Sequence, residues 1–266
     1  MRFRLCFALC CCLSLPTLAN ETACTQTIQI GASPLGSNMT VSADNQVGGM
    51  YPDLLKLIAA NSPCRFSYQI APRVRTLKWL QDGETIDMLV PVVRTTERDQ
   101  AAEFVHLLNA QVQLIYPKRL QGDPIALLNS GKLRVNVVRG FDYGPSYHAL
   151  LTQLKNAGML EEVVDAKTLV RKLQVQRLDA TLMVPQNMAS EVKEAGLESE
   201  LSMVALTQIP PIQSGAYLSY RRLDPATRQE LRRQFNLLLR NGSFWRLFQN
   251  STPSWALTAN SPATPH

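Results

Sequence analysis

The sequence predicts an α/β protein built from two similar units. Apolar segments typical of buried strands alternate with segments whose apolar residues recur at helical spacing. This alternation runs from about residue 27 to residue 90 and starts again from about residue 112 to residue 184. Strands that alternate with helices usually form a parallel sheet covered on both faces. We therefore expect two lobes, each a mostly parallel sheet flanked by helices.

The first unit contains three predicted strands, Thr27-Ala32, Phe66-Ile70 and Ile86-Val90. An amphipathic helix is predicted between the first two strands by apolar residues at helical spacing, namely Tyr51, Leu54, Leu55, Ile58 and Ala59. A shorter helix, which ends at Asp82-Gly83, is predicted between the second and third strands by Val74, Leu77 and Leu80.

The second unit repeats this pattern. Its predicted strands are Val112-Tyr116, Leu133-Val138, a short strand at Glu162-Asp165, and Asp179-Val184. Two helices are predicted between them, one by Leu150, Leu151 and Leu154, and one by Leu169, Val170 and Leu173.

The connections between the units are short and extended. The chain enters the second unit through Gln111-Lys118 and returns through Ser202-Tyr220, which contains the stiff Ile209-Pro210-Pro211. Such crossings are typical of a hinge rather than of a flexible tether.

The C-terminal part is predicted to begin with a helix and to end in a disordered tail. Asp224 is suited to cap this helix and Pro225 to occupy its first position. The helix is expected to end at Asn241-Gly242, with an apolar turn at Phe244–Phe248. The composition from residue 253 to 266 is typical of disorder.

Residues 1–19 have the order of a secretory signal peptide. Arg2 and Arg4 precede an apolar run, and the small residue Ala19 provides a cleavage point. A membrane anchor is the alternative, but a spanning helix needs about 20 apolar residues and this run is shorter. We expect cleavage after Ala19 and a mature protein that is soluble in the periplasm.

The charge of the chain argues against a nucleic-acid partner. The formal net charge is only +6 over 266 residues, and acidic and basic residues are interspersed. A late group of arginines is expected to form a solvated helix face: Arg221, Arg222, Arg228, Arg232, Arg233 and Arg240.

Only two cysteines, Cys24 and Cys64, lie outside the signal segment. In an exported chain such a pair indicates a disulfide. Each cysteine shortly precedes a predicted strand, so the two lie at the same end of the sheet if those strands are parallel neighbours. The alternative is a pair of buried free thiols.

Several motifs occur in an order that resembles one protein family. They are Gly48-Gly49-Met50-Tyr51-Pro52-Asp53-Leu54-Leu55, Leu77-Lys78-Trp79-Leu80-Gln81-Asp82-Gly83-Glu84-Thr85-Ile86-Asp87, Thr95-Thr96-Glu97-Arg98, Leu173-Gln174-Val175-Gln176-Arg177-Leu178-Asp179-Ala180 and Gly242-Ser243-Phe244. Their order and spacing resemble bacterial extracellular solute-binding proteins of family 3, which include the periplasmic binding proteins of polar amino-acid ABC transporters.

The resemblance implies a two-lobed type II periplasmic binding protein fold with a two-strand hinge and a ligand in the cleft. The first lobe would comprise residues 20–110 and 214–252, and the second lobe residues 111–213. The implied partners are a small-molecule ligand and the membrane permease of an ABC transporter, with the binding protein itself a monomer.

The resemblance also implies ligand-binding residues in the first lobe. In the family, the arginine of the T-x-x-R motif grips the ligand's carboxylate, and Arg98 occupies that position here. A planar guanidinium binds a carboxylate bidentately. Thr95 and Val93 would line the same site, while Arg73, Arg75 and Arg94 lie either near the cleft or at the surface. The alternative is that Arg98 makes a structural ion pair with Glu97, Asp99 or Glu103.

In the second lobe, the family's ligand loop corresponds to Arg139, Phe141, Asp142 and Tyr143. The aromatic rings could stack on a flat ligand, or Tyr143 could lie in the core of a simple turn. Val184 stands where the family carries an aspartate for the ligand's ammonium, although Asp142 could replace that acid. Since an unpaired buried ammonium is costly, we expect a carboxylate ligand with an apolar or neutral remainder.

No catalytic constellation stands out. The three histidines have no metal-type spacing with one another or with a cysteine, so we expect neither an enzyme nor a metal or cofactor. The alternatives are a periplasmic sensor that partners a membrane receptor and a dehydratase-like enzyme on the same fold.

Overall fold

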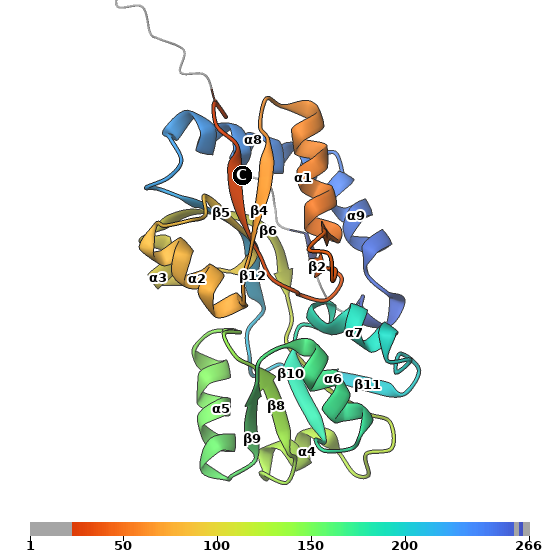
Figure 1. Cartoon of the computed structure of the whole chain (residues 1–266). Coiled ribbons are helices and arrows are strands. Elements are labelled where there is room, and N and C mark those ends of the chain that lie inside the picture. The colour runs from red at the N-terminus through yellow and green to blue at the C-terminus, as the bar shows by residue number, and fades with distance from the viewer. Residues whose placement is uncertain (1–22, 258–260, 263–266) are drawn as a thin grey trace, which may run out of the picture.

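Two mixed β-sheets form the centres of two lobes, which lie one above the other in Figure 1. The structure is a computed structural model that describes residues 23–257 and 261–262. The predicted signal peptide, residues 1–19, lies outside the described residues. None of the helices in the described part of the chain combines the length and the apolarity that crossing a membrane requires.

The first lobe contains a six-stranded sheet. Its strands, in spatial order, are β13 (Ser261–Pro262), β6 (Ala102–Ala110), β12 (Ile212–Ser219), β5 (Met88–Val93), β1 (Ile28–Ala32) and β4 (Phe66–Ile70). β1 is parallel to both β4 and β5, as the alternation of strands and helices predicts. β12 is antiparallel to β5 and β6, because it returns from the other lobe.

Helices cover both faces of this sheet. On one face α1 (Met50–Asn61), α8 (Pro225–Arg240) and α9 (Ser243–Ser251) contact one another. On the other, α2 (Arg73–Asp82) packs on β1 and β5, and the short α3 (Thr96–Asp99) contacts β6. A small hairpin of β2 (Thr40–Val41) and β3 (Val47–Gly48) precedes α1.

The second lobe contains a five-stranded sheet in the order β11 (Leu201–Ala205), β7 (Gln113–Pro117), β10 (Ala180–Met183), β8 (Val135–Val138) and β9 (Leu160–Val163). β8 is parallel to β9 and β10, whereas β7 is antiparallel to β10 and β11. The lobe also contains α4 (Pro124–Asn129), α5 (Pro145–Asn156), α6 (Ala166–Gln174), the 3-10 turn η1 (Pro185–Met188) and α7 (Ala189–Glu194).

The chain crosses between the sheets twice, between β6 and β7 and between β11 and β12 (Figure 1). The two crossings are tied together by Gln111, whose Nε2 donates hydrogen bonds to the carbonyl oxygens of Leu206 (3.0 Å) and Ile209 (2.9 Å). Most of Gln111-Lys118 forms β7, in agreement with the strand predicted at Val112-Tyr116, so only Gln111 and Val112 separate β6 from β7.

Two C-terminal segments differ from the prediction. The expected apolar turn at Phe244–Phe248 is part of helix α9, because its two phenylalanines lie four residues apart and are both buried. The segment from residue 253, predicted to be disordered, forms the 3-10 turn η2 (Ser254–Ala256) and the short strand β13 in its described part. Trp255 packs on the core, and the carbonyl of Ala256 accepts a hydrogen bond from Gln186 of the second lobe.

The arginines near α8 are largely paired rather than simply solvated. Arg228 and Arg232 both contact Glu103, and Arg222 pairs with the buried Asp87 at 2.7 Å. These pairs fix the start of α8 to the first sheet.

The predicted disulfide between Cys24 and Cys64 is confirmed, with the two Cα atoms 4.8 Å apart. It joins the chain just before β1 to the chain just before β4. Because these strands are parallel neighbours, with Ile28 opposite Phe66, both cysteines lie at one end of the sheet.

Removal of this disulfide should destabilise the first lobe. Because the bridge restricts the unfolded chain, the double variant Cys24→Ser/Cys64→Ser is expected to lose about 2–4 kcal/mol of unfolding free energy. Urea denaturation followed by circular dichroism measures this loss. Reduced wild-type protein is the control and should unfold at the same urea concentration as the variant; an unchanged midpoint in both would contradict the prediction.

Candidate functional site

Two adjoining cavities lie between the lobes. The charged cavity is lined by Arg73 and Arg98 of the first lobe and by Phe141 and Asp142 of the second. The apolar cavity is lined mainly by Tyr51, Leu108, Ala110, Val184, Ile212 and Phe248. Five residues line both cavities, namely Pro91, Val93, Tyr143, Asn187 and Ser214. The two cavities are therefore parts of one cleft.

The turn after β5 positions Arg98. Thr95 caps α3, and its hydroxyl accepts a hydrogen bond from the backbone N–H of Arg98 (3.3 Å). The backbone N–H of Thr95 itself donates to the Tyr217 hydroxyl at 3.1 Å. Thr95, which was predicted to line the site, lines neither cavity and instead caps the helical turn that carries Arg98.

The Arg98 guanidinium is held by the backbone and faces the charged cavity. Its Nη1 donates to the carbonyl of Val93 at 2.8 Å. Burial lowers the pKa of Arg98, while the carboxylate of Asp142 across the cleft raises it.

The alternative ion pairs for Arg98 do not form among the described residues, because each of the three acids has another partner. Asp99 pairs with Arg94 at 3.0 Å, Glu103 contacts Arg228 and Arg232, and Glu97 accepts a hydrogen bond from Gln81.

Arg73 is a second arginine in the charged cavity. It is the first residue of α2, and its Nη2 donates to the carbonyl of Pro91 at 2.7 Å. Burial, and secondarily the neighbouring charge of Arg98, lowers the pKa of Arg73 to about 10, so the side chain stays protonated at neutral pH. Arg75 and Arg94, for which the sequence allowed either a place near the cleft or one at the surface, are exposed and line neither cavity.

The loop after β8 brings three of its four predicted residues into the cleft. Phe141 packs against the first-lobe cluster of Leu35 and Met39. Oδ1 of Asp142 accepts hydrogen bonds from the backbone N–H of Gly144 (2.8 Å) and from His148 Nε2 (2.9 Å).

The fourth predicted residue of this loop, Arg139, lies outside the cleft. Its side chain is exposed and contacts Glu162 at 3.6 Å. It follows β8 directly, and its backbone N–H donates to the carbonyl of Val163 in β9, so its backbone continues the pairing of these two strands.

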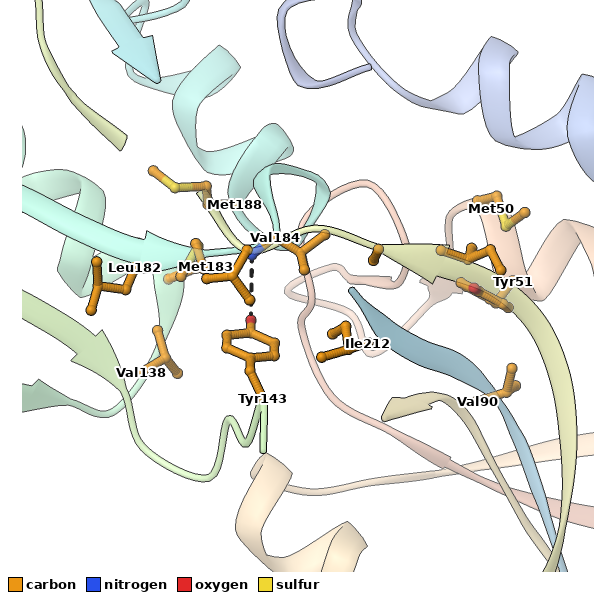
Figure 2. Close-up of a cluster of buried hydrophobic side chains, with 14 of the residues drawn as sticks. Met50, Tyr51, Val90, Val138, Tyr143, Leu182, Met183, Val184, Met188 and Ile212 are labelled. Carbon is orange, nitrogen blue, oxygen red and sulfur yellow. Dashed lines mark hydrogen bonds between the residues drawn. The ribbon is translucent and has the colours of Figure 1, made fainter. Parts of the chain in front are cut away.

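Tyr143 lies in the core, as one of the two alternatives predicted, and it also lines both cavities. Its ring is buried and packs edge-on against Tyr147, with the ring centroids 4.9 Å apart. Its hydroxyl accepts a hydrogen bond from Asn187 Nδ2 at 3.2 Å and lies 3.5 Å from the backbone nitrogen of Val184 (Figure 2). Burial raises the pKa of Tyr143 to about 12, so the hydroxyl remains protonated at neutral pH.

Val184 lies in the wall of the apolar cavity, with Ile212 of the first lobe nearby (Figure 2). Among the described residues that line the two cavities, Asp142 is the one carboxylate. The position of Val184 therefore supplies no charge for a ligand's ammonium.

The two lobes touch beside the cleft. The backbone N–H of Ser37 donates to the carbonyl of Gln186 (3.2 Å), and Asn38 Nδ2 donates to Asn187 Oδ1 (2.9 Å). Gly36 has a φ of +56°, and a Cβ added there would stand 2.0 Å from the Gln186 oxygen. Only a residue without a side chain permits this approach.

No three histidine, cysteine, aspartate or glutamate side chains are grouped to hold a metal ion in the part of the chain that the structure describes. The described residues that line the cleft thus offer two guanidinium groups, one carboxylate, the phenols of Tyr51 and Tyr143, the hydroxyl of Ser214 and neutral amides.

Comparisons with known proteins identify the fold. No family model and no curated protein matches the sequence. Solved structures do match: an ancestral arginine-binding protein bound to arginine has a TM-score of 0.69 at 16% identity, covering 84% of this chain and 97% of that chain. A putative L-cystine ABC transporter from Listeria monocytogenes has a TM-score of 0.69 at 15% identity, covering 86% and 97%.

A histidine kinase sensor domain with similarity to periplasmic binding proteins also matches, with a TM-score of 0.67 at 15% identity, covering 86% of this chain and 98% of that chain. The two-lobed periplasmic-binding-protein fold that the resemblance predicted is thus confirmed.

The contact between Gly36 and Gln186 should control closure. Gly36→Ala is expected to favour open lobes, because the new Cβ collides with the Gln186 carbonyl. Small-angle X-ray scattering should then report a larger radius of gyration. Gly158→Ala is the matched control, since its φ of +70° imposes similar backbone strain while no atom lies within 4 Å of the new Cβ. Equal scattering from both variants would show that this contact does not limit closure.

Proposed function

We propose that this chain is a periplasmic solute-binding protein that captures a small carboxylate-bearing ligand between its lobes for an ABC-type transporter. One observation carries the proposal: Arg98 faces a cleft whose walls come from both lobes. The shared fold supports a binding role, since the matching proteins named above are binding, transport or sensor proteins.

Arg98 acts as the carboxylate anchor. Its hydrogen bond to Val93 fixes the plane of the guanidinium and uses one of its five N–H donors. The remaining donors are free to bind a carboxylate bidentately, which gives orientation as well as affinity. Partial burial strengthens this contact by reducing competition from water.

Closure then surrounds the ligand. The loop with Phe141, Asp142 and Tyr143 approaches from the second lobe, and the two crossings tied by Gln111 serve as the hinge. A ligand that contacts both lobes binds the closed form better than the open form and shifts the population toward it. The closed form is the shape that a membrane permease recognises in this proposal.

The apolar cavity receives the remainder of the ligand. Val184, Leu108 and Ile212 form an apolar wall, and the polar side chains of this cavity, among them Asn38 and Gln186, are neutral. An apolar or neutral group is therefore favoured there. An α-ammonium group directed at Val184 would be buried without a charge partner.

Export to the periplasm is consistent with two features. Residues 1–19 have the composition of a signal peptide, and the Cys24–Cys64 disulfide suits an oxidising compartment. In this proposal the protein acts as a monomer and performs no catalysis.

A sensor is the second candidate function, favoured by the likeness to the histidine kinase sensor domain. The cleft would bind its ligand in the same way, and the partner of the closed form would be a membrane receptor instead of a permease.

Substitution of Arg98 tests the anchor. A thermal-shift screen of residues 20–266 against small carboxylic acids should yield a stabilising ligand, since a ligand at 100 times its Kd adds about 2.7 kcal/mol of stability. Arg98→Met should lower the affinity for that ligand by about 10- to 100-fold, as expected for charge-assisted hydrogen bonds. Isothermal titration calorimetry measures the change.

Arg94→Met is the matched control, because Arg94 is a nearby exposed arginine that lines neither cavity. The Arg94→Met variant should bind the ligand with the same affinity as the wild type. A ligand that binds both variants equally well would refute the role of Arg98.

A further inference from the structure

Arg73 and Arg98 are held along the same strand. Arg73 donates to the carbonyl of Pro91 and Arg98 to the carbonyl of Val93, two residues further along β5. Carbonyl groups two residues apart on a strand point to the same side and are separated by about 7 Å. The two guanidinium groups therefore stand side by side in the wall of the charged cavity.

Neither arginine is neutralised by the described part of the chain. No ion pair within 4.0 Å joins a carboxylate to Arg73 or Arg98, although ten pairs between a carboxylate and an arginine or lysine form elsewhere in it. The nearest acid across the cleft, Asp142, already accepts hydrogen bonds from Gly144 and His148.

Two like charges that are partly buried destabilise each other unless an anion lies between them. This repulsion contributes to the lowered pKa of Arg73, after burial. Each guanidinium has five N–H donors, and one of them is occupied by the backbone carbonyl. The pair therefore offers unused donors and two positive charges to whatever enters the charged cavity.

We propose that Arg73 is a second anion-binding residue and that the ligand is a small dicarboxylate without an ammonium group. One carboxylate binds Arg98 and the other binds Arg73. The inference rests on the proposed function, because it requires that the cleft binds a ligand at all.

The charges of the cavity favour a dianion over a zwitterion. A dicarboxylate neutralises both arginines, whereas an amino acid brings an ammonium into a wall that is already positive. Val184 offers that ammonium no partner, and Asp142 is engaged by His148. The separation of the two backbone carbonyls suits a short chain such as succinate or glutarate.

Isothermal titration calorimetry with succinate, glutarate, butyrate and L-glutamate tests the proposal on residues 20–266. We expect wild-type protein to bind succinate or glutarate at least about tenfold more tightly than butyrate or L-glutamate. Arg73→Met should weaken dicarboxylate binding by about 10- to 100-fold and leave butyrate binding within about threefold, because butyrate needs only Arg98.

Arg75→Met is the matched control, since Arg75 lies on the same helix but is exposed and outside both cavities. It should bind like the wild type. Arg73→Lys keeps the charge without the planar fork and should retain part of the dicarboxylate affinity. Circular dichroism shows whether Arg73→Met folds. If it does not, the Arg73→Lys variant still tests whether Arg73 binds the second carboxylate.

The variant Asp142→Asn distinguishes a cleft that binds a dianion from one that binds a zwitterion. Dicarboxylate binding should persist or tighten when this negative charge is removed. Tighter binding of L-glutamate than of succinate, lost in Asp142→Asn, would overturn the inference in favour of a zwitterion. Equal affinities for butyrate and succinate, both reduced in Arg73→Met, would overturn it in favour of a single carboxylate held by two arginines.

The remaining outcomes distinguish the two proposals. Dicarboxylate binding that is indifferent to Arg73 would overturn this inference and leave the proposed function standing. A folded wild-type protein that binds none of the four probes and no acid in the thermal-shift screen would overturn both.

Discussion

The two crossings of the chain, tied together by the Gln111 amide, hold the lobes face to face. Each crossing joins a strand of one sheet to a strand of the other, so neither lobe can rotate freely. The hydrogen bonds from Gln111 to Leu206 and Ile209 make the two crossings one mechanical unit. Every contact across the cleft, from Ser37–Gln186 to Asn38–Asn187, depends on this unit to bring its partners together.

The two lobes contribute different chemistry to the cleft. The first lobe supplies positive charge, because the guanidinium groups of Arg73 and Arg98 donate hydrogen bonds to two carbonyls of β5, those of Pro91 and Val93. The second lobe supplies aromatic and neutral groups, with Tyr143 held by Asn187, and a single carboxylate. In the proposed function, a ligand that contacts both sides stabilises the closed form, and binding is thereby coupled to closure.

Local pattern predicted most elements but missed those that depend on distant partners. The parallel strands β1, β4 and β5 follow from apolar runs between helices, and their order explains the disulfide. Strand β6 was not predicted, because its buried and half-buried residues do not alternate regularly along the chain. Its extended conformation is explained by its pairing with β12. Helix α9 was read as a turn, since the partners that bury its apolar face, helices α1 and α8, lie elsewhere in the chain or are recognised only in the fold; the ring of Tyr51 in α1, for example, packs against Phe244.

The sequence by itself determined the alternation of strands and helices, the pairing of the two cysteines, and the motif that makes Arg98 the candidate anchor. Each of these depends on residues that are close in the chain or on covalent chemistry. Only the tertiary structure decided that Arg73 enters the charged cavity while Arg139 stays outside it, and that Gly36 meets Gln186. The physical reason is that the cleft is formed by segments far apart in sequence, whose side chains converge only when the two sheets are set against each other.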